Sequence, residues 1–343
     1  MEDNKKVLDQ MKEDIKNADI PEAEKSKLMK SFLKLKNEKI NIMITGATGC
    51  GKSSTINALF GTEKAKVGVG VDPETMEIEK YDLENLVLWD SPGLGDGREA
   101  DNRHAKNIIK KLNERDADGN LLIDLVLVIL DGGSRDLGTS YELINSIIIP
   151  NLGDDKSKRI LVAINQADMA MKGRYWNFEE NRPEPKLVEF LEEKVQSVKK
   201  RIKEGTGVNV EPIYYSAGYK DDSGEQRPYN LSKLLYYIMS CTPKEKRLAV
   251  VDNINNNQEM WKDNDELQDY RRGILEKVAD TFTDCLSGGA EIGEAVLGTI
   301  GGLFGDVGET VGTVVGKAIG GAVGVVTGIV GGAIRFIGGL FGL

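Results

Sequence analysis

Short apolar runs alternate with amphipathic stretches through the middle of the chain. Between the runs, residues 101–115, 136–148 and 184–204 carry apolar side chains at helical spacing. Each run is almost continuously apolar, which is typical of strands covered on both faces. The pattern predicts an α/β fold, with a mostly parallel sheet and helices on both sides. The five runs are INIMI, LVLWD, IDLVLVILD, RILVAIN and PIYYSA.

The flanking regions have a different texture. Before the first run the chain is mostly charged, and its apolar residues predict two short amphipathic helices separated by Pro21. The polar insert KGRYWNFEENRPEP at 172–185 predicts a surface loop, and a helix is expected near 266–285. The predicted segments are an N-terminal helical part, an α/β domain, a polar linker with a helix, and a glycine-rich tail: 1–38, 39–243, 244–286 and 287–343.

Composition narrows the class of function. The chain has 343 residues, a formal charge of −10 and a pI near 5.0, so no long-range field attracts it to nucleic acid. Its three cysteines lack metal-ligand spacing, which favours a reducing, cytoplasmic setting. The charged N-terminus predicts no signal peptide.

The tail at 287–343 holds nearly half of the chain's 39 glycines. A Gly-x-x-x-Gly stripe lets another helix backbone approach closely, although each glycine weakens a lone helix by about 1 kcal/mol relative to alanine. Seven glycines recur at every fourth residue: Gly308, Gly312, Gly316, Gly320, Gly324, Gly328 and Gly332.

An uncharged run within this tail extends from Ala318 to Ile334, between Lys317 and Arg335. As a helix it would span about 26 Å, slightly less than the roughly 30 Å hydrocarbon core of a bilayer. Contact with membrane lipid, packing against the protein itself and soluble self-assembly therefore remain alternatives for the tail.

The strongest motif lies where the first apolar run ends. Residues 46–53, GATGCGKS, satisfy G-x-x-x-x-G-K-[ST] between an expected strand and an expected helix. In such a loop the backbone N–H groups surround phosphates, Lys52 reaches the β and γ oxygens, and the Ser53 hydroxyl binds Mg²⁺. The predicted nucleotide-binding residues here are Gly46, Ala47, Thr48, Gly49, Cys50, Gly51, Lys52, Ser53 and Ser54.

Two further segments extend the phosphate side of the predicted site. The sequence Asp90-Ser91-Pro92-Gly93 closes the LVLWD run, and its D-x-x-G pattern predicts Asp90 near Mg²⁺ and the Gly93 N–H near the γ-phosphate. Thr62 follows the helix too closely to reach the nucleotide, so Thr75 is the predicted Mg²⁺-sensing switch residue. An ordinary turn threonine is the alternative for Thr75.

Base recognition is predicted at the ends of two later runs. Asp168, in Asn165-Gln166-Ala167-Asp168, can accept from the guanine N1–H and exocyclic amine, a donor pair that adenine lacks. Ser216-Ala217 can offer a backbone N–H to the guanine carbonyl. The carboxyl ends of strands in an open α/β sheet meet at the ligand-binding edge. The sequence therefore predicts GTP and GDP as ligands.

Residues about 40 to 242 resemble the GTPase domain of the TRAFAC class, including Era-like and septin-like members, prophage-associated bacterial GTPases and immunity-related GTPases. The resemblance implies a six-stranded Ras-like sheet with one antiparallel strand, Mg²⁺ as cofactor, and GTP hydrolysis with contributions from Lys52, Thr75 and Gly93. It rests on five motifs in order, at 46–53, Thr75, 90–93, 165–168 and 216–217.

Two residues depart from the family pattern. Gln166 replaces the lysine that lies along the base in most relatives, and Leu94 replaces the glutamine that orients the attacking water in Ras-like members. Intrinsic hydrolysis is therefore expected to be slow and to be stimulated by a nucleotide-dependent homodimer or a partner. Asp96, Arg98 and His104 are weak candidates for the missing group, and the lone histidine is expected to be a solvated surface residue.

Two functions remain open from the sequence. In the first, a cytoplasmic GTP-driven switch controls the tail at 287–343, which acts at a membrane. In the second, a soluble Era-like assembly GTPase acts on RNA or ribosomes, and the tail is purely structural. The acidic charge favours the first, and no nucleic-acid partner is expected.

Overall fold

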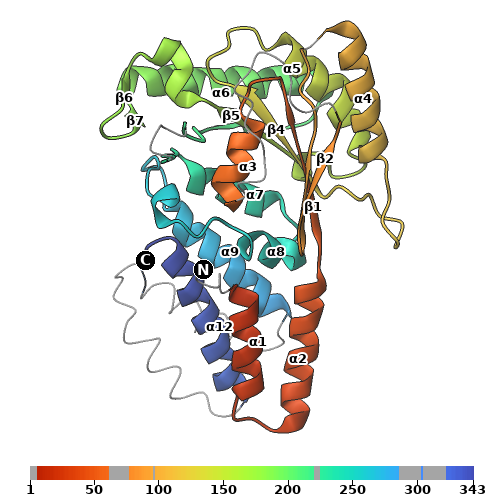
Figure 1. The fold of residues 1–343 in the computed structure, drawn as a ribbon, viewed down its shortest axis with the longest axis vertical. Helices are drawn as coiled ribbons and strands as arrows, with labels where there is room; N and C mark the ends of the chain where they lie inside the picture. Colours follow the sequence, from red (N-terminus) through yellow and green to blue (C-terminus); the bar gives the residue numbers. More distant parts are fainter. Residues whose placement is uncertain (1–5, 62–76, 96, 220–224, 286–302, 304–321) are drawn as a thin grey trace. The chain divides into compact units, whose positions relative to one another are not determined.

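In the computed structural model the chain forms two compact units (Figure 1). The α/β unit comprises Ile40–Thr242 and Glu259–Leu267, and the helical unit comprises Met1–Lys39, Pro243–Gln258 and Gln268–Leu343. The structure describes residues 6–61, 77–95, 97–219, 225–285, 303 and 322–343.

A six-stranded sheet forms the centre of the α/β unit, in the order β2-β3-β1-β4-β5-β8. Only β2 is antiparallel to its neighbour, so the predicted Ras-like sheet with one antiparallel strand is confirmed. The parallel strands β1, β4 and β5 are almost entirely buried, as their continuous apolar runs predict. The strands are β1 Ile40–Gly46, β2 Glu79–Leu83, β3 Leu86–Asp90, β4 Leu125–Asp131, β5 Ile160–Asn165 and β8 Ile213–Tyr214.

Helices cover both faces of this sheet. On one face, α4, α6 and the π-helical segment η1 pack over Val126, Val128 and Leu130, which alternate along β4. The helices α3 and α7 contact each other, and α7 packs on β5. The bounds are α3 Lys52–Phe60, α4 Arg98–Leu112, α5 Gly138–Glu142, η1 Leu143–Ile148, α6 Pro185–Thr206 and α7 Leu231–Cys241, with short 3-10 segments at Ile149–Asn151, Lys156–Lys158 and Ala167–Gly173.

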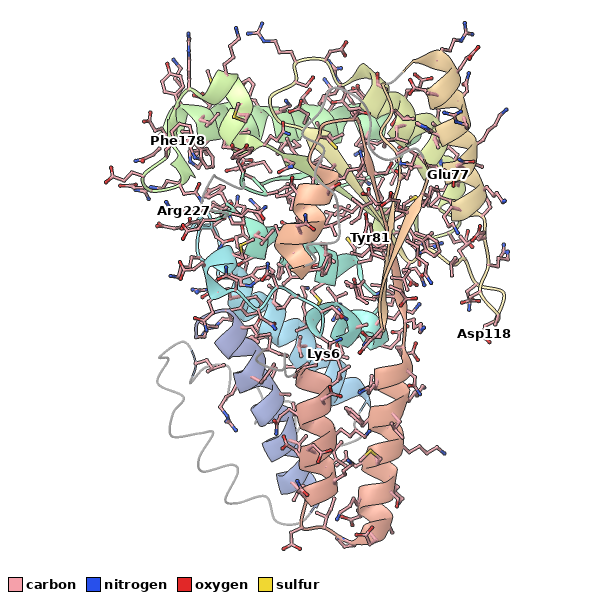
Figure 2. The ribbon with its side chains drawn as sticks, viewed as in Figure 1. Lys6, Glu77, Tyr81, Asp118, Phe178 and Arg227 are labelled. Carbon is pink, nitrogen blue, oxygen red and sulfur yellow. The ribbon has the colours of Figure 1, made fainter. Side chains whose placement is uncertain are left out.

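The insert expected to be a surface loop contains a small hairpin instead, formed by β6 Trp176–Asn177 and β7 Arg182–Pro183. Trp176 is only 6% exposed and packs edge-to-face on Tyr229, with ring centroids 5.3 Å apart. Phe178, by contrast, is 71% exposed at the hairpin loop (Figure 2). The prediction was wrong for Trp176 because one large apolar side chain anchors an otherwise polar segment.

The segment Glu259–Leu267, which we call the strap, joins the α/β unit although it is remote in sequence. Asp263 accepts a hydrogen bond from the Arg227 guanidinium at 2.9 Å. Asp265 forms a largely buried ion pair with Lys233 at 2.7 Å. Charged and polar side chains thus fasten the strap to the loop and helix that follow β8.

The helical unit contains the two predicted N-terminal amphipathic helices. Leu8, Met11 and Ile15 form the buried stripe of α1, and α12 packs against both α1 and α9. The described helices of this unit are α1 Val7–Asn17, α2 Glu22–Asn37, α8 Arg247–Val251, α9 Tyr270–Cys285 and α12 Ala322–Leu340, with a 3-10 turn at Lys244–Lys246.

The part of the glycine stripe that the structure describes lies on α12. Among the described residues, a Cβ added at Gly328 would meet nothing within 4 Å, and one at Gly332 would meet only Asp14 Oδ2, at 3.8 Å. The buried side of α12 instead carries Val330 and Ile334. Gly308, Gly312, Gly316 and Gly320 lie outside the described residues. Of the helices in the described part of the chain, none combines the length and hydropathy needed to cross a bilayer.

Candidate functional site

The loop between β1 and α3 has the compact shape that its glycines allow. Gly51 has a φ of +88°, and a Cβ there would lie 2.3 Å from Asn165 Nδ2, so glycine is required. The Lys52 side chain is only 9% exposed, and its ammonium donates to the carbonyls of Ala47 at 3.2 Å and Gly46 at 3.4 Å. The lysine is therefore already directed into the loop.

Asn165 joins three of the predicted segments. Its side chain, 2% exposed, donates from Nδ2 to the Cys50 carbonyl at 2.9 Å and accepts at Oδ1 from the Ala217 N–H at 2.9 Å. Cys50 is fully buried under the loop, and burial raises the pKa of its thiol. The sequence predicted these residues for one site, and the structure brings them together.

Asp168 lies beside Ser216, as expected for a shared base-binding edge. The Ser216 hydroxyl donates to Asp168 Oδ1 at 2.6 Å and accepts from the Gly218 N–H at 3.1 Å. Within the described part of the chain, Asp168 Oδ2 makes no hydrogen bond. One carboxylate oxygen is thus fixed, and the other can receive a donor.

Gln166, the first departure from the family pattern, turns toward the loop after β1. Its Nε2 donates to the Gly49 carbonyl at 2.9 Å. Its backbone has a φ of +59°, in the left-handed region. In this structure the side chain therefore contributes one hydrogen bond to the loop after β1.

A buried hydroxyl pair supports the same edge and was missed by sequence reasoning. The Thr55 hydroxyl donates to the Gly51 carbonyl at 2.8 Å and lies 2.7 Å from the Tyr215 hydroxyl, which therefore donates to it. Tyr215 is 0% exposed, and burial raises the pKa of its phenol. A tyrosine in the largely apolar run PIYYSA was the available signal, because a buried hydroxyl needs a partner.

Asp90 ends β3 next to β1, opposite Ile44 in the strand register. It is 1% exposed, and its Oδ1 has no hydrogen-bond partner among the described residues. Burial, with a smaller contribution from the Glu79 carboxylate, raises the pKa of Asp90 to about 6 against the lowering effect of the nearby Lys52 ammonium. A buried carboxylate oxygen without a partner is suited to a hard cation, so the residues present fit Mg²⁺.

Of the other two predicted metal ligands, the structure describes Ser53 but not Thr75. Ser53 lies in the first turn of α3 and is half-buried. Thr75, the predicted switch residue, lies outside the described residues, as does Asp96. Ser53 and Asp90 are therefore the described members of the predicted metal set.

The chain after Asp90 runs beside the phosphate loop. Leu94 forms a parallel bridge with Ala47, and its carbonyl accepts from the Thr48 N–H at 3.2 Å. Leu94 is 4% exposed, so its apolar side chain is packed in the core. Arg98 begins α4 and is exposed.

His104 is not the solvated surface residue that the sequence suggested. It is 1% exposed on α4, and its Nδ1 lies 3.1 Å from the Gly93 carbonyl. The missed signal is a four-residue spacing: His104, Ile108 and Leu112 are the buried residues of this helix. The polar residues around the histidine obscured that stripe.

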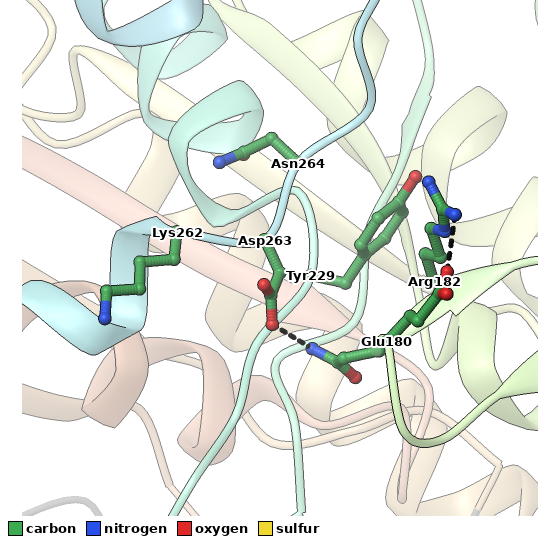
Figure 3. Close-up of a pocket in the computed structure, with 7 residues that line it drawn as sticks. Glu180, Arg182, Tyr229, Lys262, Asp263 and Asn264 are labelled. Carbon is green, nitrogen blue, oxygen red and sulfur yellow. Dashed lines mark hydrogen bonds and ion pairs between the residues drawn. The ribbon is translucent and has the colours of Figure 1, made fainter.

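A polar pocket of about 350 Å³ lies between the β6–β7 hairpin and the strap (Figure 3). Its charged side chains are paired: Arg182 with Glu180, Lys262 with Glu259, and Asp263 with Arg227. Among the described residues that line the pocket, each cation is therefore paired with a carboxylate.

Comparison with known proteins identifies the domain. Residues 41–166 match the model of a family described as 50S ribosome-binding GTPase. The chain contains a P-loop GTPase domain. Interferon-inducible GTPase 1 of Mus musculus is 44% identical over 62 residues, covering 16% of this chain and 15% of the relative. The uncharacterized protein YkfA of Escherichia coli (strain K12) is 29% identical over 157 residues, covering 45% of this chain and 50% of the relative. The matches thus span half or less of these relatives' lengths.

Two solved structures show the same kind of similarity at lower identity. Toc33 from Arabidopsis thaliana in complex with Mg²⁺ and GMPPNP is 16% identical, covering 70% of this chain and 97% of that chain, with a TM-score of 0.41. Era from Aquifex aeolicus bound to GDP·AlF4⁻ is 16% identical, covering 72% and 68%, with a TM-score of 0.39.

Proposed function

We propose that this protein binds GTP and GDP with Mg²⁺ and hydrolyses GTP as a molecular switch. The observation that carries the proposal is the Asn165 side chain, which ties the phosphate loop at Cys50 to the Ala217 backbone. That link supports one continuous site in which phosphate binding and base binding are adjacent. P-loop GTPases supply the chemical precedent.

In the proposed reaction Lys52 binds the β and γ oxygens, and the Gly93 N–H contacts the γ-phosphate. Ser53, Asp90 and Thr75 would hold Mg²⁺, which would supply positive charge to the phosphates when bound. Buried Leu94 offers no polar atom to orient water, which supports slow intrinsic turnover. Asp168 would select guanine through Oδ2 while Ser216 holds Oδ1.

The test is calorimetry of the full chain with GTP, GDP and ATP, with and without Mg²⁺, alongside phosphate release. Asp168→Ala should weaken GTP binding about 10- to 100-fold, because it removes charge-assisted hydrogen bonds. Lys172→Ala, on an exposed side chain a few residues later, is the matched control and should bind as wild type. Equal affinity for ATP and GTP, or no heat with GTP, would overturn the proposal.

A nucleotide-dependent homodimer is the second part of the proposal, because the missing water-orienting group must come from elsewhere. Turnover per protein should then rise with protein concentration, and light scattering should detect dimers with a GTP analogue but not with GDP. A specific rate independent of concentration, with a monomer in both states, contradicts it.

Control of the C-terminal tail at a membrane is the third part. It is motivated by the glycine stripe, whose positions Gly328 and Gly332 have open space or one distant atom beside them among the described residues. Full-length protein with a non-hydrolysable GTP analogue should float with liposomes more than a chain ending at residue 286. Equal flotation favours the alternative that α12 is structural, which its packing on α1 and α9 supports.

An Era-like role on RNA or ribosomes is the alternative function, supported by the match of residues 41–166 to a family described as 50S ribosome-binding GTPase. The formal charge of −10 opposes it. Salt-sensitive, GTP-dependent co-sedimentation with ribosomes would favour this alternative over the membrane hypothesis.

A further inference from the structure

His104 is a buried polar residue outside the proposed nucleotide and metal contacts. Its Nδ1 lies 3.1 Å from the Gly93 carbonyl, and a carbonyl only accepts, so Nδ1 must carry a proton and donate it. The other ring nitrogen, Nε2, is buried and has no partner among the described residues. A leucine here would avoid that unfavourable burial. Packing alone does not require the hydrogen bond to Gly93.

A second side chain of α4 holds the same loop. Asp101 Oδ1 accepts from the Gly95 N–H at 2.8 Å, and Asp101 precedes His104 by three residues, so both lie on one face of the helix. We call this pair the α4 clamp. It fixes a carbonyl at Gly93 and an amide at Gly95, on either side of Leu94.

The clamped segment lies directly on the phosphate loop. A Cβ at Gly93 would be 2.5 Å from Thr48 N, and the Leu94 carbonyl accepts from that N–H. Because a peptide unit is planar, holding the Gly93 carbonyl also fixes the direction of the Leu94 N–H. Any displacement of Gly93 by a γ-phosphate must therefore move or break the contact with His104.

We propose that His104 is a positioning residue for GTP hydrolysis: its Nδ1–H holds the Gly93 carbonyl, and with Asp101 it links the γ-phosphate-sensing glycine to α4. The proposal rests on the proposed function, and it adds the residue that sets the geometry of the glycine. His104 does not contact the nucleotide in this role. Its effect is on the rate, through the placement of Gly93.

The test compares His104→Asn with His104→Leu in the full chain. Asparagine can place an N–H donor near the position of Nδ1, whereas leucine fills a similar volume without a donor. His104→Leu should bind GTP within about threefold of wild type but lower single-turnover hydrolysis about tenfold, and His104→Asn should recover most of the rate. Lys106→Ala, on the exposed side of α4, is the control and should retain the wild-type rate.

A second variant keeps the proposal testable if His104→Leu folds poorly. Asp101→Ala removes the other arm from a half-exposed position and should slow hydrolysis a few-fold, with less than additive loss in the double variant. Wild-type rates in both single variants would overturn the proposal. So would equal losses in His104→Leu and His104→Asn that follow their unfolding midpoints, because that pattern is a purely structural role. A wild-type protein that binds no GTP would instead refute the proposed function.

Discussion

On the proposed guanine side of the site, polar side chains meet partners within the protein. Asn165 uses both ends of its amide, and Ser216 both donates and accepts. On the proposed phosphate side, Asp90 Oδ1 and His104 Nε2 are buried without partners among the described residues. Folding thus completes the base-binding framework apart from Oδ2 of the partly exposed Asp168, whereas the phosphate side retains buried polar atoms without partners that a cation or a conformational change can satisfy.

The largest effect is expected for Asn165→Ala, which should destabilise the proposed guanine side of the site. Removing the amide leaves the Cys50 carbonyl and the Ala217 N–H buried without their partner, at about 1–3 kcal/mol each. We expect a loss of about 2–5 kcal/mol in the free energy of unfolding, measured by urea denaturation. Asn113→Ala, at an exposed position after α4, is the control. A stable Asn165→Ala protein with normal GTP affinity would contradict the framework.

The next largest effect is expected for Asp90→Asn, which should stabilise the protein. Asp90 lies on the proposed phosphate side, where its buried Oδ1 has no partner among the described residues. Its pKa is about 6 in the fold against an ordinary value of 3.8, so the folded state binds the proton more tightly. Stability from this group is therefore lost as pH rises from about 4 to 6, by up to about 3 kcal/mol. Asp90→Asn should raise the unfolding free energy of the nucleotide-free protein at pH 7.5, and that gain should vanish near pH 4.

Two outcomes bear on this prediction. The same variant should lose the Mg²⁺-dependent part of its GTP affinity, measured by calorimetry. If Asp90→Asn is instead less stable than wild type at pH 7.5 without nucleotide, Asp90 is not an unfavourable buried charge and the contrast between the two sides fails.

Acidification should weaken Mg²⁺ binding on the proposed phosphate side through protonation of Asp90. Mg²⁺ requires the ionised Asp90 carboxylate, so protons compete with it below a pH of about 6. The Mg²⁺-dependent increase in GTP affinity should fall by up to about tenfold per pH unit in that range. In Asp90→Asn the affinity should be nearly flat over the same range. A wild-type profile that is equally flat would remove Asp90 from the proposed metal set.

A smaller loss is expected from Tyr215→Phe. This change removes the hydroxyl that donates to Thr55 and should cost about 1 kcal/mol of unfolding free energy. Thr55→Val and the double variant complete a cycle that isolates the coupling energy. Strictly additive losses would show that the two hydroxyls do not support the guanine side together.

The smallest effect is expected at Gln166, where one hydrogen bond reaches the Gly49 carbonyl from a partly exposed side chain. Gln166→Ala should change GTP affinity by less than about fivefold, since a neutral hydrogen bond contributes about 1 kcal/mol or less net. Gln166→Lys should tighten binding slightly if a lysine at this position can lie along the base. A loss above tenfold in Gln166→Ala would make Gln166 part of the essential framework.

Much of the site follows from strand ends that the sequence already marks. Asp90 and Asn165 each close an apolar run, and parallel strands bring their carboxyl ends to one edge. The α/β class and the P-loop could be predicted because short-range periodicity and glycine spacing encode them, whereas the single antiparallel strand was expected only from the resemblance to the GTPase family. The roles of individual site residues remain predictions.

Other features depended on contacts between segments distant in sequence. The burial of His104 required the Gly93 loop to fold back on α4, and the burial of Trp176 required Tyr229. The strap joined the α/β unit because Asp265 pairs with Lys233, which lies 32 residues earlier in the chain. The periodicity of apolar residues alone could not predict which polar side chains are buried or which partners they have.

By itself, the sequence determined the order of strands and helices and the phosphate loop at Gly46–Ser53, because local spacing restricts the backbone there. Only the tertiary structure decided which polar atoms are satisfied and which are not, such as Asn165 and Asp90. Hydrogen-bond partners are chosen by three-dimensional proximity, and side chains far apart in the sequence meet only when the whole sheet has formed.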